Sequence, residues 1–496
     1  MTGTLYGVGL GPGDPELMTV KAARLISEAS VIAYHCARHG RSIARSVAEP
    51  YLREGQVEEK LVYPVTTETT DHPGGYEGAI ADFYELSAKR LAEHLDAGRD
   101  VVLLCEGDPF FYGSYMYMHE RLSGRFEAVV VPGVTSVSAA SAVLGRPLVQ
   151  RDEVLTVLPG TLPAPELARR LADTDAAAVL KLGRTFGSVR EAFEEAGKLD
   201  DAVFVERATW GQQRIEPLAS VDPSTVPYFS LALLPSPAYA SRVSPAPATS
   251  PSPASGGEVV VVGLGPAGPE WLTPEAAVEL SAAEHIVGYG PYVARVPQKA
   301  GQQRHASGNR VEADRARDAL SLAASGARVA VVSSGDPGVF AMASAVLEQV
   351  SSGHGTGVRV RIVPGVTAAQ AAASRVGAPL GHDYCVLSLS DRLKPWEIIE
   401  KRLDAAGAAD LVLALYNPAS RSRTTQLADA RGVLLRHRAP STPVVVARDV
   451  GGPEEDIRVT TLGDLDPSTV DMRCLLIVGS SKTRAENGVV WTPRSY

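Results

Sequence analysis

Two aspartates that follow short apolar runs are the residues of this sequence best placed to do chemistry. Asp108 lies in a Gly-Asp-Pro triplet after the run VVLLCE, and Asp336 lies in the same triplet after VAVVSS. A carboxylate at the end of a strand can hydrogen-bond a substrate or accept a proton during a reaction. An aspartate between glycine and proline can also do no more than fix a turn. Both interpretations stay open for Asp108 and Asp336.

The Gly-Asp-Pro triplets belong to a series of motifs that occurs twice, in the same order. The copies are VGLGPGDPE at 8–16 with VGLGPAGPE at 262–270, GDP at 107–109 with 335–337, and PGVT at 132–135 with 364–367. This order indicates an internal duplication. The first motif recurs at an offset of 254 residues and the second at 228, so the first half has 26 extra residues between them. We expect them to form an extra loop and helix near residues 62–86.

The first glycine motif of each half matches nucleotide-binding loops only in part. The pattern G-x-G-x-x-G is satisfied at Gly263–Gly268 but fails at Asp14 in the first copy. Pro12 and Pro266 also occupy positions where a dinucleotide-binding turn offers N–H groups. A P-loop is excluded because no Gly-Lys-Ser/Thr follows. Glycines that only permit tight turns would explain one copy, but two ordered copies favour a binding role.

Composition excludes several classes of function. The chain has 496 residues, 45% of them hydrophobic, and a formal net charge of −9. This predicts two or three globular domains without a basic field for nucleic acid or an anionic membrane. The sequence shows neither an export signal nor about 18 consecutive apolar residues, so we expect a cytoplasmic protein without a membrane span. Four scattered cysteines indicate neither a zinc site nor a disulfide framework, and we expect no metal.

Short apolar strands alternate with helical stretches in each half, which predicts an α/β fold. The first half opens with LYGVGLG, a helix near 19–27, VIAY, a helix near 79–97, VVLLCEGD and FEAVVVPG. Four more strand candidates follow in each half, namely VLTVLPG, AAVLKLG, AVFVERA and YFSLALL in the first, and CVLSLS, LVLALYN, PVVVARD and CLLIVGS in the second. Each half is therefore expected to form two α/β subdomains that flank a cleft.

A Pro/Ala/Ser-rich segment separates the two halves. Residues 235–257 read PSPAYASRVSPAPATSPSPASGG and contain no periodic apolar residues. Such a segment cannot bury enough surface to offset the entropy lost on ordering. We therefore predict a first module at 1–234, a flexible linker at 235–257 and a second module at 258–496.

The ordered motifs GxGPGDPExxT, GDP and PGVT resemble those of the tetrapyrrole methyltransferase family, over essentially the whole chain outside the linker. The resemblance implies two subdomains around a cleft, S-adenosylmethionine held between them as the methyl donor, precorrin substrates and a homodimer. A sulfonium donor already carries a good leaving group. Methyl transfer from it needs mainly positioning and exclusion of water, which suits motifs built from small residues.

The resemblance also implies which residues contact the donor. In the first half these are Pro12, Gly13, Glu106, Gly107, Asp108, Phe111, Thr135, Ser136, Leu182 and Ala208. In the second half they are Pro266, Gly335, Asp336, Val339, Thr367, Ala368, Asn417 and Asp449. The second half departs from the family pattern at Ala267 and Gly268, where the first half has Gly13 and Asp14.

The many carboxylates of a tetrapyrrole call for arginine or lysine near the cleft. The predicted substrate-binding residues are Arg38, Arg184, Arg421 and Arg423. Arg421 and Arg423 are favoured because they follow a strand end, where open α/β sheets bind ligands. Further candidates are Arg41, Arg45, Arg295, Arg310 and Arg448.

Finer features distinguish the halves within the family. EGDPFFYGSY and ERATWGQQRI make the first half similar to enzymes that methylate precorrin-2 at carbon 20. LALYNPASRSR and VARDVGGPEEDI make the second half similar to enzymes that methylate precorrin-3B at carbon 17 and contract the ring. The resemblance thus implies a bifunctional methyltransferase of cobalamin biosynthesis. Cobalt-bearing substrates, a different methyl acceptor such as diphthamide or ribosomal RNA, and an inactive half that serves as a scaffold remain alternatives.

Overall fold

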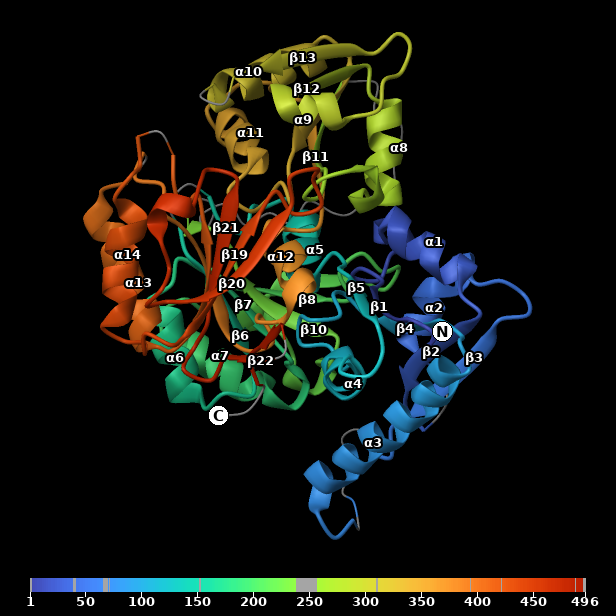
Figure 1. Cartoon of the computed structure of the whole chain (residues 1–496). Coiled ribbons are helices and arrows are strands. Elements are labelled where there is room, and N and C mark those ends of the chain that lie inside the picture. The colour runs from blue at the N-terminus through green and yellow to red at the C-terminus, as the bar shows by residue number, and fades with distance from the viewer. Residues whose placement is uncertain are drawn as a thin grey trace. The chain divides into compact units, whose positions relative to one another are not determined.

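The computed structural model describes residues 2–38, 42–65, 70, 72–150, 153–237, 257–308, 311–392, 394–420, 422–486 and 488–493 (Figure 1). Most of the predicted linker, residues 238–256, lies outside the described residues. The chain divides into two compact units, Met1–Thr135 and Ser136–Tyr496. The first unit is the N-terminal part of the first half, and the second unit contains the rest of the chain.

The first unit is built on a parallel sheet with the strand order β3-β2-β4-β1-β5. Its strands are β1 (Leu5–Gly9), β2 (Val31–Cys36), β3 (Val57–Val62), β4 (Val101–Cys105) and β5 (Ala128–Val131), and its helices are α1 (Val20–Glu28), α2 (Ile43–Ala48), α3 (Gly75–Asp96) and α4 (Tyr115–Leu122). The inner strands are short apolar runs whose side chains are buried. Thr19 fixes the start of α1, where its hydroxyl accepts a hydrogen bond from the N–H of Ala22.

The second unit contains a sheet of the same design, with the order β13-β12-β14-β11-β15 and parallel pairing throughout. The strands are β11 (Glu258–Gly263), β12 (His285–Tyr289), β13 (Gln303–Ser307), β14 (Arg328–Ser333) and β15 (Arg359–Val363), and the helices are α8 (Pro274–Ala282), α9 (Gly290–Arg295), α10 (Glu312–Ala324) and α11 (Met342–Ser351). The repeated order confirms the predicted duplication. Helix α3 has 22 residues and α10 has 13, so part of the extra sequence in the first half lengthens this helix.

The C-terminal parts of the two halves share one continuous sheet. Its order among the described strands is β20-β19-β21-β18-β17-β6-β7-β10-β8-β9. The first half supplies β6 (Leu155–Pro159), β7 (Ala176–Leu180), β8 (Val203–Glu206), β9 (Arg214–Pro217) and β10 (Ser230–Leu234), and the second half supplies β17 (Tyr384–Ser388), β18 (Val412–Tyr416), β19 (Pro443–Arg448), β20 (Asp456–Thr461) and β21 (Cys474–Val478). The halves join where β6 pairs with β17 in antiparallel register, with Val157 opposite Tyr384 and Leu155 opposite Val386. Backbone hydrogen bonds therefore connect the two modules.

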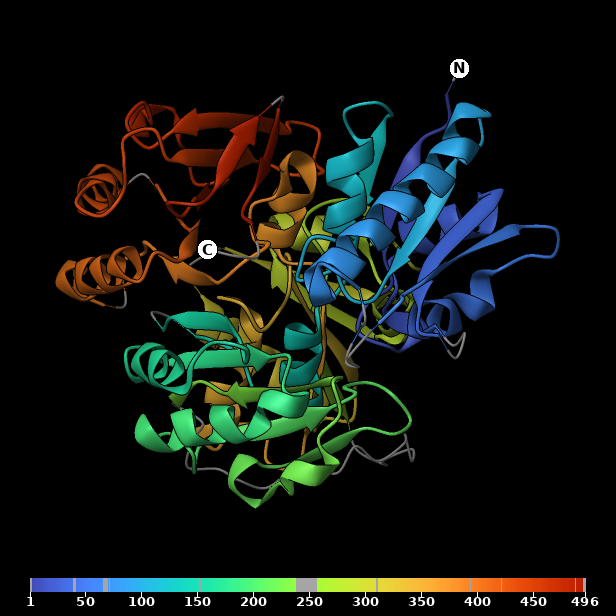
Figure 2. The ribbon, with the colours of Figure 1, turned by 90° about the horizontal axis from the view of Figure 1, so that it is seen from below.

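Helices pack on this sheet in matching pairs. The remaining helices are α5 (Ser136–Leu144), α6 (Ala164–Ala172), α7 (Phe186–Glu195), α12 (Ala368–Val376), α13 (Trp396–Ala408) and α14 (Gln426–Leu435), with short strands β16 (Gly377–Ala378), β22 (Arg484–Glu486) and β23 (Val489–Trp491). Figures 1 and 2 show α13 beside α14, in orange, and α6 beside α7, in green. Leu167 and Leu171 lie on one face of α6 and pack with Phe193 of α7 in a buried cluster. Leu403 of α13 and Leu427 of α14 belong to the equivalent cluster.

Two ion pairs cross between the halves beside the β6–β17 junction. Arg170 of α6 pairs with Asp383, which precedes β17, and both side chains are almost fully buried. Arg402 of α13 pairs with Asp175 at 2.7 Å and is more exposed. Within the described part of the chain, no helix is both long and apolar enough to cross a bilayer.

Candidate functional site

Glycine motifs at the carboxyl ends of neighbouring strands are tied together by their backbones. In the second half, Gly265 after β11 donates to the carbonyl of Gly335 after β14 at 3.1 Å, and Gly335 donates back at 2.8 Å. Gly11 and Gly107 make the same reciprocal pair in the first unit, at 3.2 and 2.8 Å. Gly107 and Gly335 have φ values of +65° and +67°, which side chains rarely tolerate. Each half thus holds two strand-end loops in a fixed relation.

A third glycine brings the next loop against this pair. A Cβ on Gly365 would lie 2.4 Å from the carbonyl oxygen of Gly335, and a Cβ on Gly133 would lie 2.1 Å from that of Gly107. These distances are far below van der Waals contact, so no larger residue fits without moving the backbone. The glycines of the PGVT motifs are therefore required by close packing between adjacent strand ends.

Asp108 and Asp336 bridge the same loops with their carboxylates. Asp336 accepts the N–H of Gly338 at 2.8 Å and that of Gly365 at 3.1 Å. Asp108 accepts the N–H of Phe110 at 2.9 Å and that of Gly133 at 3.1 Å. Burial raises the pKa of Asp108 to about 7 and the pKa of Asp336 to about 6, against the opposing effect of these backbone N–H groups. Both aspartates fix a turn, and their predicted catalytic role stays a prediction.

In the second half, the loop after β15 lies against the end of β18. Thr367 caps α12 by accepting the N–H of Gln370 at 3.2 Å. The first turn of α12 contacts β18, because the N–H of Ala369 donates to the hydroxyl of Tyr416 at 3.2 Å. Tyr416 directly precedes Asn417, and its ring lies 5.4 Å from that of Phe340. The structure thus places the start of α12, which carries the predicted residues Thr367 and Ala368, against Tyr416, the residue before Asn417. The sequence did not single out Tyr416.

Left-handed backbone conformations mark the strand ends of the shared sheet. Asn417 after β18 and Asp449 after β19 have φ values of +51° and +50°. Lys181 after β7 and Arg207 after β8 occupy the same places in the first half, with φ values of +61° and +46°. The residues equivalent to Asn417 and Asp449 therefore lie one position before the predicted Leu182 and Ala208. Such strained residues persist where a site requires them.

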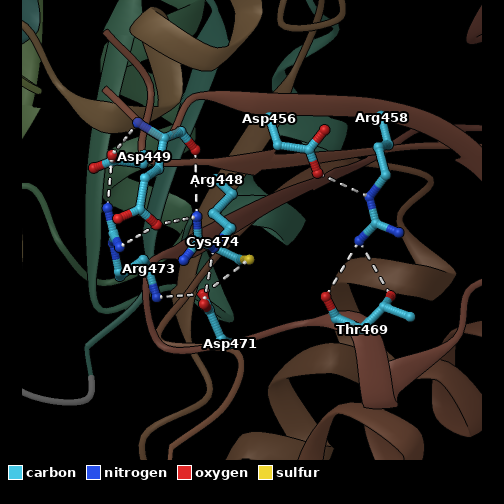
Figure 3. Close-up of polar contacts among 9 residues, drawn as sticks. Arg448, Asp449, Asp456, Arg458, Thr469, Asp471, Arg473 and Cys474 are labelled. Carbon is cyan, nitrogen blue, oxygen red and sulfur yellow. Dashed lines mark hydrogen bonds and ion pairs between the residues drawn. The ribbon is translucent and has the colours of Figure 1, made fainter. Parts of the chain in front are cut away.

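The carboxylate of Asp449 is held by charged neighbours at the end of β19. It pairs with Arg473 at 2.6 Å (Figure 3). It also accepts the N–H of Glu454 at 3.1 Å. Arg448 pairs with Asp471 at 2.9 Å, and Asp471 also accepts from the thiol of Cys474 (Figure 3). On the neighbouring strand β20, Arg458 contacts Asp456 and Thr469 instead. These partly exposed pairs are individually weak, but together they order the turn at Asp449.

The other predicted first-half residues are divided between the two units. Pro12, Gly13, Glu106, Phe111 and Thr135 lie in the first unit, and Ser136, Leu182 and Ala208 lie in the second. Glu106 accepts the N–H of Ala44 at 3.1 Å, at the start of α2. Leu182 and Ala208 are buried. Contact of these residues with a methyl donor stays a prediction.

Comparison with known proteins identifies the architecture. The sequence profile of the family Tetrapyrrole (Corrin/Porphyrin) Methylases matches residues 4–222 and again residues 258–466. The chain is a tandem tetrapyrrole methylase. The family consists of S-adenosylmethionine-dependent methyltransferases, so the predicted fold class, enzyme class and methyl donor are confirmed.

Relatives of this tetrapyrrole methylase match it both whole and by halves. "Cobalamin biosynthesis protein CobIJ" of Mycobacterium tuberculosis (strain ATCC 25618 / H37Rv) is 60% identical over 100% of this chain and 96% of its own length. "Precorrin-2 C(20)-methyltransferase" of Sinorhizobium sp is 51% identical over 47% of this chain and 95% of its own. "Precorrin-3B C(17)-methyltransferase" of Sinorhizobium sp is 47% identical over 48% of this chain and 97% of its own.

The predicted substrate arginines of the tetrapyrrole methylase have different surroundings. Arg423 is nearly buried, donates to the carbonyl of Asn417 at 3.0 Å and pairs with Asp391 at 3.6 Å. Arg38 and Arg184 are exposed. Arg421, together with Arg41 and Arg310, lies outside the described residues. Arg423 thus holds the Asn417 turn, and contact of these arginines with substrate stays a prediction.

Arg295 supports the first loop of the second module of the methylase. From the end of α9 it donates to the carbonyls of Gly265, at 2.8 Å, and Ala267, and to the hydroxyl of Ser334 at 3.0 Å. These contacts surround Pro266, a predicted donor-binding residue. The sequence offered Arg295 only as one of several possible substrate arginines. Its contact with this loop could not be predicted, because the two are about 30 residues apart along the chain.

Replacing Arg295 with alanine is expected to weaken donor binding by the second module. The change removes the hydrogen bonds from the guanidinium to the carbonyls of Leu264, Gly265 and Ala267, so the loop around Pro266 loosens, and we expect binding about tenfold weaker. Isothermal titration with S-adenosylhomocysteine measures this. Arg295→Lys keeps the charge but not the planar set of donors and should recover only part of the affinity. Unchanged affinity in both variants would show that Arg295 does not position the loop.

Proposed function

We propose that this chain is a bifunctional methyltransferase of cobalamin biosynthesis. The first module, residues 1–234, methylates precorrin-2 at carbon 20. The second module, residues 258–496, methylates precorrin-3B at carbon 17 with contraction of the ring. The observation that supports this most strongly is the match of each half to a different enzyme over nearly the whole of that enzyme's length, alongside a full-length relative with both halves.

We assign donor binding to the strand-end loops that are built alike in both modules. S-adenosylmethionine supplies a methyl group on a sulfonium sulfur, and the chain must orient the donor and keep water out. The loops suit this task because they offer backbone groups and small side chains. The open space at Gly107, where a Cβ would meet nothing within 4 Å, fits a close approach to the backbone. In the second module we assign the donor to Pro266, Gly335, Val339, Thr367, Ala368, Asn417 and Asp449.

Both modules share the structural features to which we assign donor binding. The second module lacks Gly13 and Asp14 of the first, but it keeps the reciprocal glycine bonds and the buried aspartate. This resemblance favours two working sites over an inactive scaffold half. We therefore expect two molecules of S-adenosylhomocysteine to bind per chain.

Two further assignments rest on the family alone. The homodimer that the family resemblance implies stays a prediction, as does location in the cytoplasm. Sedimentation of the purified chain over a range of concentrations tests the first. The sheet that joins β6 to β17 already pairs the C-terminal parts of two family modules within one chain.

Incubation of the purified chain with precorrin-2 and methyl-labelled S-adenosylmethionine tests the proposed function. We expect one labelled methyl group at carbon 20, located by mass spectrometry and NMR. A second incubation with precorrin-3B should place a label at carbon 17 of a contracted ring. Transfer only to the cobalt-bearing counterparts would move the assignment to the cobalt-dependent route, and transfer to none of these substrates would overturn it.

A further inference from the structure

The Asp336 turn of the second module is covered by a segment of the first module. Helix α5 follows directly after the PGVT motif of the first half, and it packs against β15 of the second half. Residues 138–149, which comprise most of α5 and the chain after it, therefore lie over residues 336–339. Both segments belong to the second compact unit.

Three contacts at successive positions connect these segments. The hydroxyl of Ser138 hydrogen-bonds the carboxylate of Asp336. A Cβ on Gly338 would lie 3.3 Å from Oγ of Ser141, so the helix approaches the turn closely. Val149 then pairs with Val339 as an isolated parallel bridge. Ser138, Ser141 and Val149 are buried, which makes this cover a packed interface.

The second module does not make the contact to Asp336 with its own equivalent residue. In the alignment of the two PGVT motifs, the counterpart of Ser138 is Gln370 of α12. The side-chain amide of Gln370 donates to the hydroxyl of Tyr384 at 3.3 Å instead. The side-chain bond to the Asp336 carboxylate therefore comes from the other module.

We propose that Ser138 of the first module is a positioning residue for methyl-donor binding in the second module. Its hydroxyl donates to Asp336, whose two carboxylate oxygens hold the N–H groups of Gly338 and Gly365. The second site is thus completed by a helix of the first module. This inference rests on the proposed donor site, because Asp336 acts here through the loops assigned to the donor.

Ionisation of Asp336 gives the proposal a measurable signature. Burial raises the pKa of Asp336, whereas the Ser138 hydroxyl and the two backbone N–H groups lower it by favouring the carboxylate. A protonated carboxyl group would lose an acceptor for one N–H, so donor binding should weaken at acidic pH. Tyr416, from β18, is a titratable neighbour of Asp336, and burial raises its pKa to about 12, so it stays neutral over this range. Loss of the Ser138 bond should move the weakening to higher pH.

The test compares Ser138→Ala, Ser138→Thr and Ser236→Ala in the full chain. Ser236 is a matched control, since it is also buried and donates to a carboxylate, that of Glu153 at 2.7 Å. Labelled S-adenosylmethionine is cross-linked by ultraviolet light over a pH series, and label in peptides of 258–496 reports binding by the second module. We expect Ser138→Ala to bind about tenfold more weakly and its acid limb to move up by about one pH unit. Ser138→Thr should restore both.

A double variant separates a specific role from a general loss of packing. In a chain with Asp336→Asn, adding Ser138→Ala should have no further effect on binding if Ser138 acts through Asp336. Equal effects of Ser138→Ala and Ser236→Ala, an unmoved pH profile, or additive effects in the double variant would each overturn the proposal. Binding without methylation of precorrin-3B would refute the proposed reaction and leave this test intact. Label absent from 258–496 in the unaltered chain would refute the donor site itself.

Discussion

Replacing Gly365 with alanine is expected to remove donor binding from the second module while the first module keeps it. The new Cβ would lie 2.4 Å from the carbonyl oxygen of Gly335, and backbone atoms cannot rotate away as a side chain can. The loop after β15 must therefore move from the loop after β14, and the bond from Gly365 to Asp336 is lost. We expect binding at least 100-fold weaker, because the change displaces the backbone of the site itself. Titration with S-adenosylhomocysteine should fall from two sites per chain to one.

The duplication supplies the reciprocal experiment. A Cβ on Gly133 would lie 2.1 Å from the carbonyl oxygen of Gly107, so Gly133→Ala should disable the first module and leave the second. Under the proposed function, the Gly133 variant loses carbon-20 methylation and the Gly365 variant loses carbon-17 methylation. The unaltered module in each chain reports whether the protein has folded.

Two glycines with open surroundings are matched controls. A Cβ on Gly124 or on Gly432 would meet no atom within 4 Å. Gly432 lies within α14, where alanine should stabilise the helix by about 0.5–1 kcal/mol. Both control variants should bind two molecules of S-adenosylhomocysteine. Two full-affinity sites in the Gly365 variant would contradict the close packing described for the PGVT loop.

The inner strands of the shared sheet could be predicted from sequence, and its two edge strands could not. The runs VLTVLPG and LVLALYN became β6 and β18, which are buried inside the sheet and therefore mostly apolar. Strands β9 (Arg214–Pro217) and β20 (Asp456–Thr461) lie at the two ends of the shared sheet. Most of their residues are partly or fully exposed, so charged and polar side chains interrupt the apolar pattern. A search for apolar runs therefore overlooks them.

The pairing of the two halves through β6 and β17 could not be predicted from sequence either. Each half offers a strand, β6 or β17, whose free edge could pair with a second chain or with its own duplicate, and composition does not distinguish these partners. The extra segment of the first half could be located from the sequence, because the offset between the repeated motifs changes there. Its later part overlaps the long helix α3, Gly75–Asp96.

Some residues of the candidate site could be predicted from sequence and others could not. Asp336 and Gly365 stand in repeated motifs, so the sequence draws attention to both. Lys181 has a left-handed backbone conformation, which residue type does not reveal. Ser138 acts across the module boundary, in a part of α5 that reads as an ordinary small-residue helix. Its role requires knowing that α5 packs on the other half.

Replacing Asp383 with alanine is expected to destabilise the junction of the two modules by about 3–5 kcal/mol. Its carboxylate is fully buried against Arg170, whose side chain is 6% exposed. Without Asp383 the guanidinium keeps Glu166 at 2.7 Å but loses its buried partner beside the β6–β17 pairing. Native-state hydrogen exchange of peptides that contain β6 and β17 should show this loss, because backbone hydrogen bonds of these strands join the halves.

Two further variants test whether the buried ion pair itself, and not the surrounding packing, stabilises the junction. Arg402→Ala removes the more exposed pair with Asp175 and should cost about 1 kcal/mol or less. A double replacement, Arg170→Met with Asp383→Leu, removes both buried charges and should recover most of the stability lost in Asp383→Ala, since neither desolvated group remains. If Asp383→Ala and Arg402→Ala weaken exchange protection equally, the buried pair does not hold the junction. If the double replacement is as unstable as Asp383→Ala, packing around the pair decides the stability, and the loss of the buried carboxylate partner of Arg170 does not.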